Sequence, residues 1–207
     1  MKMFKSVAII GPICAGKTTL SNALGNMLSV KVLHLDKIKN KYLNKNFFLK
    51  QSENSLNKYG LKRFFLTQAS AEAEFLKHFI QKPAQEGIHD FGAGMLWALN
   101  NDDLSNIINA FDEVFLILPS LHKSRCLKII YNRLKTRLST DPEIMKYTLD
   151  EKFNLVESLL DFYWKFQQTF SCKIVETRIS LSSSILNFIE CLEVESRAAA
   201  KEKILKI

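Results

Sequence analysis

Residues 6–20 read Ser-Val-Ala-Ile-Ile-Gly-Pro-Ile-Cys-Ala-Gly-Lys-Thr-Thr-Leu. A short apolar run ends at Gly11, and four residues later Gly16-Lys17-Thr18 opens a segment with helical apolar periodicity. This is the pattern G-x-x-x-x-G-K-[ST] between a strand and a helix, which is the context that phosphate binding requires. The two glycines let the loop curl so that its N–H groups point at an anion, and the helix N-terminus adds its dipole. The stretch therefore predicts a nucleoside triphosphate site.

The side chains and the backbone of this loop both suit a nucleotide. Lys17 can reach the β- and γ-phosphates, and the Thr18 hydroxyl can bind Mg²⁺. A chance match in an ordinary strand–turn–helix unit is the alternative, and the flanking strand and helix argue against it. We expect ATP and Mg²⁺ to be held by the whole loop, which consists of Gly11, Pro12, Ile13, Cys14, Ala15, Gly16, Lys17, Thr18 and Thr19.

Length and composition favour one globular domain. The 207 residues suit a single domain with a small lid or helical insertion, and the 47% of apolar residues suffice for a full core. No apolar run is long enough to cross a bilayer. The first five residues lead directly into the strand before the phosphate loop, so removing this region as a signal peptide would destroy the loop. We therefore do not expect export.

The four cysteines point to a reducing compartment. They lie far apart and form no C-x-x-C pair, so neither a zinc site nor a disulfide framework is favoured. One of them lies inside the phosphate loop, where it should be a thiol. The sequence predicts a cytoplasmic protein; its cysteines are Cys14, Cys126, Cys172 and Cys191.

The chain is basic, with a net charge of +8 and a pI of about 9.3. Such a charge can indicate a nucleic-acid partner. However, the lysines are scattered, and no RNP or helix-turn-helix pattern accompanies them. A protein that handles polyanionic ATP and an acidic second substrate would also be basic. We therefore expect a small-molecule acceptor and no nucleic acid, and the sequence leaves the oligomeric state open.

Apolar patterns predict strands that alternate with helices along the chain. The region from 37 to 81 shows helices and no strand. Five strands alternating with helices imply a parallel sheet covered on both faces, which is a three-layer α/β fold. The predicted strands are 5–11, 30–35, 87–91, 114–118 and 173–176, and the main predicted helices are 17–28, a helix reaching Ile80, 100–109, 121–138, 143–169 and 181–206.

The order of these motifs resembles the shikimate kinase family, and more broadly the nucleoside-monophosphate-kinase-like P-loop kinases. The resemblance covers most of the first 140 residues. It rests on the phosphate loop, the strand ending at Asp36, the strand-end sequence Asp90-Phe91-Gly92-Ala93-Gly94, and the strand 114–118 followed by an arginine-bearing helix. It implies a P-loop nucleoside triphosphate hydrolase fold and transfer of a phosphoryl group from ATP to a small molecule. It also implies a substrate-binding insertion over 37–81 and a lid over 133–150.

The family places Asp-x-Asp at the end of the second strand, and this chain keeps only the second acid, in His34-Leu35-Asp36. The resemblance implies that Asp36 positions the acceptor hydroxyl and can take its proton. The alternative is that Asp36 caps the helix that begins at Lys37. The loss of the first acid leaves open a degenerate kinase that binds nucleotide without transfer.

The strand end at Asp90 resembles the family's metal and substrate region. Asp90 would be a Walker-B-type acid that holds the water shell of Mg²⁺ and offsets the missing first Asp. The alternative is an exposed Asp before a glycine turn. Gly92, Ala93 and Gly94 stand where the family has its glycine-rich substrate loop.

Several further residues receive roles from the resemblance. Arg133 would stack on adenine, and Arg137 would reach the transferring phosphoryl group. The alternative is that both belong to a solvated basic face. Thr177 falls where the family contacts adenine. Arg63 would bind an acidic substrate, although its sequence context is out of register with the family pattern.

Two other functions stay open. A nucleoside monophosphate kinase would use the insertion at 37–81 to bind a base. A nucleotide-gated switch would hydrolyse its nucleotide slowly without an acceptor.

The chain lacks the N-K-x-D element that usually accompanies GTP, so ATP is favoured. The aromatic helix over 153–170 exceeds a minimal shikimate kinase, which favours a different small hydroxylated or phosphorylated acceptor.

Overall fold

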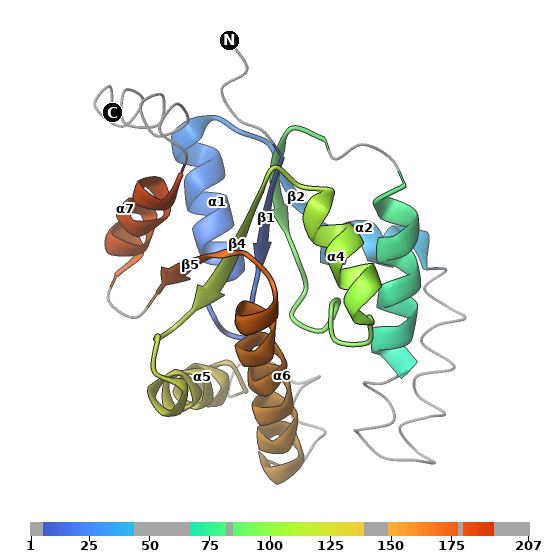
Figure 1. Cartoon of the computed structure of the whole chain (residues 1–207). Helices are drawn as coiled ribbons and strands as arrows, with labels where there is room; N and C mark the ends of the chain where they lie inside the picture. The colour runs from blue at the N-terminus through green and yellow to red at the C-terminus, as the bar shows by residue number, and fades with distance from the viewer. Residues whose placement is uncertain (1–5, 44–66, 82–84, 139–148, 178–179, 193–207) are drawn as a thin grey trace.

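The computed structural model describes residues 6–43, 67–81, 85–138, 149–177 and 180–192. The sheet strands are β1 (Ser6–Ile10), β2 (Val32–His34), β3 (Gly87–Asp90), β4 (Glu113–Leu118) and β5 (Lys173–Glu176). The helices are α1 (Lys17–Leu28), α2 (Leu35–Tyr42), α4 (Asn101–Asn109), α5 (Lys123–Leu138), α6 (Leu149–Thr169) and α7 (Leu181–Cys191), together with a helix over 67–79. Figure 1 shows the helices around the central sheet.

The five strands form one parallel sheet in the order β2-β3-β1-β4-β5. The predicted three-layer α/β fold is confirmed. Strand β1 lies in the middle, and all of its residues are buried. Since the carboxyl ends of parallel strands lie along one edge, the segments after β1, β2, β3 and β5 meet there. That edge holds the phosphate loop, Asp36, the glycine-rich loop and Thr177.

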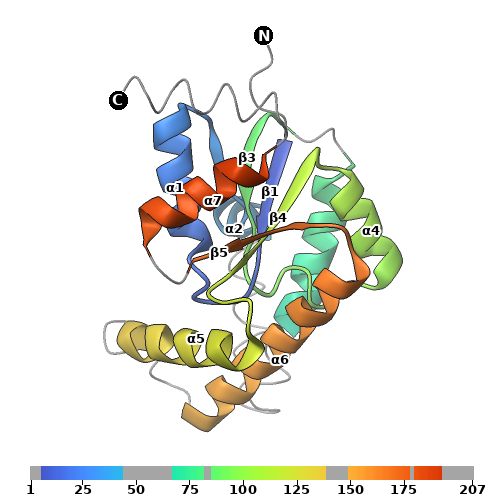
Figure 2. The same ribbon diagram turned by 60° about the vertical axis from the view of Figure 1, so that its left-hand side comes forward.

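The alternating side chains of β1 belong to two separate cores. Val7 and Ile9 pack with α1 and α7 on one face of the sheet. Ala8 and Ile10 face the opposite core, which is formed by α4, α5, α6 and the helix over 67–79. Figures 1 and 2 both show α1 beside α7, and α4 on the other face. The sheet edge that carries the site is therefore supported from both faces.

Two predicted elements differ from the structure, and the start of a third is not described. Strand β2 starts at Val32 rather than at residue 30 and is only half-buried, because it is an edge strand and pairs with β3 alone. Helix α7 ends at Cys191, because Leu192 has extended dihedrals. The prediction of a helix that continues through Leu192 to 206 is therefore wrong at Leu192. The predicted start of the α6 helix at 143 lies outside the described residues.

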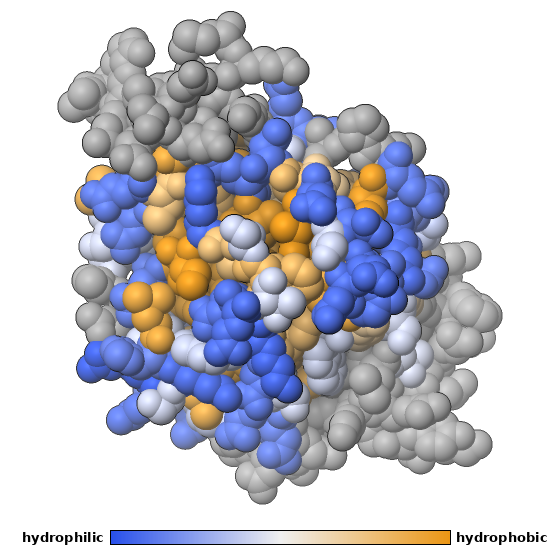
Figure 3. All heavy atoms as spheres, viewed as in Figure 1, coloured by the Kyte–Doolittle hydropathy of each residue, from blue (hydrophilic) through white to orange (hydrophobic). Residues whose placement is uncertain are grey.

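The space-filling view of Figure 3 shows mostly hydrophilic side chains around a smaller apolar area. Four large apolar side chains of the described residues are exposed, namely Tyr42, Leu121, Leu181 and Leu186. In the part of the chain that the structure describes, no helix has the length and apolarity needed to cross a membrane.

Candidate active site

The phosphate loop has the curled backbone that its sequence predicts. Gly11 and Gly16 have φ angles of 146° and 96°, in the region that favours glycine. A Cβ at Gly11 would also collide with the carbonyl oxygen of Ile117. Gly16 is the N-cap of α1, which begins at Lys17. The free N–H groups of the first turn of α1 therefore point at the loop, as anion binding requires.

Lys17 lies across the phosphate loop and is held in place by it. Its Nζ donates to the carbonyl oxygens of Gly11 at 2.8 Å and Pro12 at 2.9 Å. Burial lowers the pKa of Lys17 to about 8, although the carboxylates of Asp90 and Asp36 oppose that shift. Both hydrogen-bond partners are neutral, and the carboxylates of Asp90 and Asp36 act on the ammonium without a direct ion pair. The charge of the ammonium is available to a phosphate.

Thr18 and Asp90 form an oxygen pair at the start of α1. The Thr18 hydroxyl donates to Asp90 Oδ2 at 2.8 Å, and His34 Nδ1 lies 2.9 Å from the same oxygen. Asp90 is only 6% exposed, so the alternative of an exposed Asp is wrong. Its Oδ1 is buried and has no hydrogen-bond partner among the described residues.

These oxygens fit the magnesium ion that the resemblance implies. Mg²⁺ is usually held by one or two carboxylates together with substrate phosphates and water. The described residues contain no group of three His, Cys, Asp or Glu side chains arranged for a metal, and a magnesium–nucleotide site does not need one. The Thr18 hydroxyl and the unpartnered oxygen of Asp90 are the right kind of ligand.

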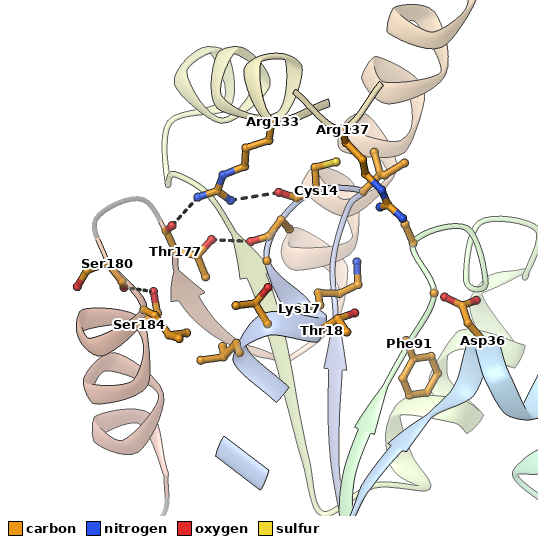
Figure 4. A pocket seen from close by; sticks show the side chains of 18 residues that line it. Cys14, Lys17, Thr18, Asp36, Phe91, Arg133, Arg137, Thr177, Ser180 and Ser184 are labelled. Carbon is orange, nitrogen blue, oxygen red and sulfur yellow. Dashed lines mark hydrogen bonds between the residues drawn. The ribbon is translucent and has the colours of Figure 1, made fainter. Parts of the chain in front are cut away.

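Arg133 and Thr177 fasten the phosphate loop to the end of β5 (Figure 4). Arg133 donates to the carbonyl oxygens of Cys14 at 3.1 Å and Thr177 at 2.8 Å. The Thr177 hydroxyl donates to the carbonyl oxygen of Ala15 at 2.6 Å. The structure thus brings these predicted residues together, and Arg133 is not part of a solvated basic face. Arg137 lies one turn further along α5, at the exposed rim of the same site.

These residues surround a cavity of about 640 Å³. Figure 4 shows Asp36 on the wall opposite Arg133 and Thr177, with Lys17 between them. The sequence did not single out several residues of the lining, which are Leu20, Phe91, Ser180, Leu181 and Ser184. The cluster of serines at the start of α7 was the signal that could have identified the last three. Ser180 caps α7 by accepting from the N–H of Ser183 at 3.1 Å.

Asp36 stands at the junction of this cavity and a second one. It lies in the first turn of α2, whose N-cap is His34, so the alternative of Asp36 as a helix cap is wrong. Its side chain is 60% exposed and lies against Gly92, where an added Cβ would collide with the carboxylate. The carboxylate is therefore accessible to a ligand from either cavity.

The second cavity has a volume of about 180 Å³. It shares Ile13, Asp36, Gly92 and Ala93 with the first. Its other lining residues are Lys39, Gln68, Ala69, Glu72, Gly94, Trp97, Leu155 and Leu159, and none of these except Gly94 was a sequence-predicted site residue. The buried Tyr163 of α6 donates its hydroxyl to the carbonyl oxygen of Ala93 at 2.9 Å and so anchors the glycine-rich loop. Arg63 lies outside the described residues.

No family model matches the sequence, and no curated protein matches it. Solved structures do match the fold. The chain is similar to shikimate kinase from Bacteroides thetaiotaomicron with a TM-score of 0.56 and 19% identity, over 92% of this chain and 99% of that one. It is also similar to shikimate kinase from Acinetobacter baumannii in complex with shikimate. The TM-score is 0.57 and the identity 15%, over 99% of this chain and 93% of that one.

A deoxyadenosine kinase from M. mycoides with bound dCTP is also similar, with a TM-score of 0.52 and 16% identity, over 89% of this chain and 97% of that one. These similarities extend over nearly the whole of each matched structure's chain. The chain therefore has the P-loop kinase fold, and the predicted fold resemblance is confirmed.

Proposed function

We propose that this protein transfers the γ-phosphoryl group of ATP to a hydroxyl group of a small-molecule acceptor. The observation that carries the proposal is the position of Asp36. This one accessible carboxylate lies in the wall of the cavity that holds Lys17, and it also lines the smaller cavity beside it. A phosphoryl donor in the large cavity and an acceptor in the small one would meet at Asp36.

The large cavity supplies the groups that ATP needs. The backbone of residues 11–19 would hold the phosphates, and Lys17 would contact the β- and γ-phosphates. Arg133, Thr177 and the start of α7 would contact the adenine end. Thr18 and Asp90 would hold Mg²⁺, which neutralises charge on the β- and γ-phosphate oxygens when bound.

Asp36 would orient the acceptor hydroxyl and take its proton while that oxygen forms a bond to the γ-phosphorus. The bond from the γ-phosphorus to the bridging oxygen breaks, and ADP leaves. Lys17 and Arg137 would stabilise the negative charge that develops on the phosphoryl oxygens. Positioning and electrostatics account for this reaction, and no covalent intermediate is needed.

Two regions complete the proposal. The helix over 67–79 supplies Gln68 and Glu72 to the small cavity, which supports an acceptor-binding role for the insertion at 37–81. Helix α5 supplies Arg133 and Arg137, which supports a closing role for the region that begins at 133. The cytoplasmic location stays a prediction.

The test is ADP release from ATP·Mg²⁺ with and without acceptors, using a panel of small sugars and polyols, hydroxy acids that include shikimate, and nucleoside monophosphates. Stimulation by one acceptor, lost in Asp36→Asn, would support the kinase. Slow hydrolysis that no acceptor changes would favour a nucleotide-gated switch. ATP binding without any turnover would identify a degenerate kinase, and preference for a nucleoside monophosphate would identify that class of kinase.

A further inference from the structure

The small cavity has a different charge balance from the large one. Among the described residues, its lining holds two carboxylates, Asp36 and Glu72, and one cation, Lys39. The large cavity is lined by Lys17, Arg133 and Arg137 and by the single carboxylate Asp36. Among the described lining residues, the acceptor side therefore carries an excess of negative charge, and the nucleotide side carries an excess of positive charge.

The positive charge of Lys39 is already compensated. Its Nζ donates to Glu72 Oε1 at 2.5 Å and to Asp36 Oδ1 at 3.2 Å. Burial acts to lower the pKa of Lys39, but the carboxylates of Glu72 and Asp36 outweigh burial and raise it. Lys17 and Arg133, by contrast, donate to neutral backbone carbonyls. An anionic acceptor would therefore meet a neutralised ammonium and a carboxylate that repels it.

Glu72 is held rigidly in this arrangement. It is 5% exposed, and Gln68 Nε2 donates to the same Oε1 at 3.2 Å. Its other oxygen, Oε2, would lie 3.5 Å from a Cβ added to Gly94, which places it beside the glycine-rich loop. The amide of Gln68, the third proton of Lys39 and this free side of Glu72 are hydrogen-bonding groups that suit hydroxyls.

Other lining residues of the small cavity are apolar. They include Trp97, Ala69 and Leu159, and Leu159 and Ala69 are buried. A volume of 180 Å³ holds about six water molecules at liquid density. A lining that combines aromatic and aliphatic side chains with hydrogen-bonding groups suits a compact molecule that has C–H faces and O–H edges.

We propose that the acceptor is an uncharged, polyhydroxylated molecule of about monosaccharide size, and that Asp36 and the Lys39–Glu72 pair select it against acidic acceptors. This inference rests on the proposed kinase function. The hydroxyls of the acceptor donate to Asp36 and Glu72 and accept from Lys39 and Gln68. This selection acts against acidic acceptors, because a carboxylate or phosphate there would lose its water and would find no free cation among the described lining residues.

The test is transfer of ³²P from γ-labelled ATP to matched pairs that differ mainly in charge, such as glucose with glucuronate and inositol with quinate. We expect the neutral member of the accepted pair to have a kcat/KM at least about tenfold higher. In Glu72→Gln, this preference should shrink by about tenfold because the pair then carries a net positive charge. Glu74→Gln is the matched control, since Glu74 is an exposed acid on the same helix and lines neither cavity.

A measurement on the unaltered protein avoids dependence on how Glu72→Gln folds. With a non-hydrolysable ATP analogue and Mg²⁺ present, the neutral acceptor should raise the Tm and its acidic partner should not. Transfer to an acid or a nucleoside monophosphate in preference to every neutral polyol would overturn this inference and leave the kinase standing. If no acceptor in the panel takes up label, the kinase proposal fails and this inference fails with it.

Discussion

The two cavities on either side of Asp36 use the same kind of residue for opposite purposes. Lys17 and Lys39 are both buried lysines beside a glycine-rich loop. Lys17 donates to backbone carbonyls and keeps its charge for a ligand, whereas Lys39 donates to two carboxylates and has no charge left over. The hydrogen-bond partners of a lysine, together with its burial, therefore decide whether it can attract an anion.

The largest expected effect breaks the large cavity. Lys17→Ala should lower kcat by about a thousandfold, because it removes a cation that stabilises the phosphoryl transition state. The fold should stay intact, since burial of this ammonium opposes its charged form. Steady-state ADP release and thermal unfolding would measure both. Near-normal turnover in a folded Lys17→Ala variant would overturn the assignment, and Lys128→Ala at an exposed site on α5 is the control.

The next largest effect is expected at Asp36, which lies between the two cavities. Asp36→Asn should lower acceptor-dependent kcat by about a hundredfold, because an amide cannot take the hydroxyl proton. The affinity for ATP should change little, since Lys17 and the loop remain. Asp102→Asn, at an exposed position of α4, provides the comparison. If Asp36→Asn were as active as the control, Asp36 would not be the group that acts on the acceptor.

Two glycines sharpen the boundary. In Gly92→Ala, the new Cβ would collide with the Asp36 carboxylate, so kcat/KM for the acceptor should fall by about tenfold. In Gly94→Ala, the nearest of the surrounding atoms, Glu72 Oε2, would lie 3.5 Å from the new Cβ, an ordinary contact, and the loss should be only about twofold. Equal losses in the two variants would show that Asp36 need not stand where the structure places it.

A last effect, about as large as that of Gly92→Ala, concerns pH. Because the pKa of Lys17 is about 8, its protonated fraction falls about tenfold between pH 7 and pH 9, and the affinity for ATP should weaken by about the same factor. Titration calorimetry at several pH values would measure this, and Lys17→Met should abolish the dependence.

The effect of the same group on stability has the opposite sign. Between pH 8 and 10.5 the unfolded chain binds more protons at Lys17 than the folded chain does, so its contribution to the free energy of unfolding rises with pH in that window. For the prediction on binding, an affinity for ATP that stayed constant from pH 7 to pH 9 would contradict the lowered pKa of Lys17.

The sequence predicted the large cavity better than the small one. Residues 11–19 are contiguous, and their spacing alone specifies a loop between a strand and a helix, which the structure confirms. Arg133 and Thr177 were predicted through the resemblance and do lie at this loop. The small cavity was only half predicted. Asp36 and the glycine-rich loop were identified, but Lys39, Glu72 and Trp97 were not.

The sequence by itself determined the sheet, the phosphate loop and the order of the elements, because local periodicity and glycine spacing encode them. Only the tertiary structure decided which distant side chains pair. Lys39 and Glu72 are 33 positions apart, and Thr18 and Asp90 are 72 apart. Their meeting depends on how α2, α1, β3 and the helix over 67–79 pack at one edge of the sheet. The sequence gives the charge of a side chain, but tertiary packing determines which partner neutralises that charge.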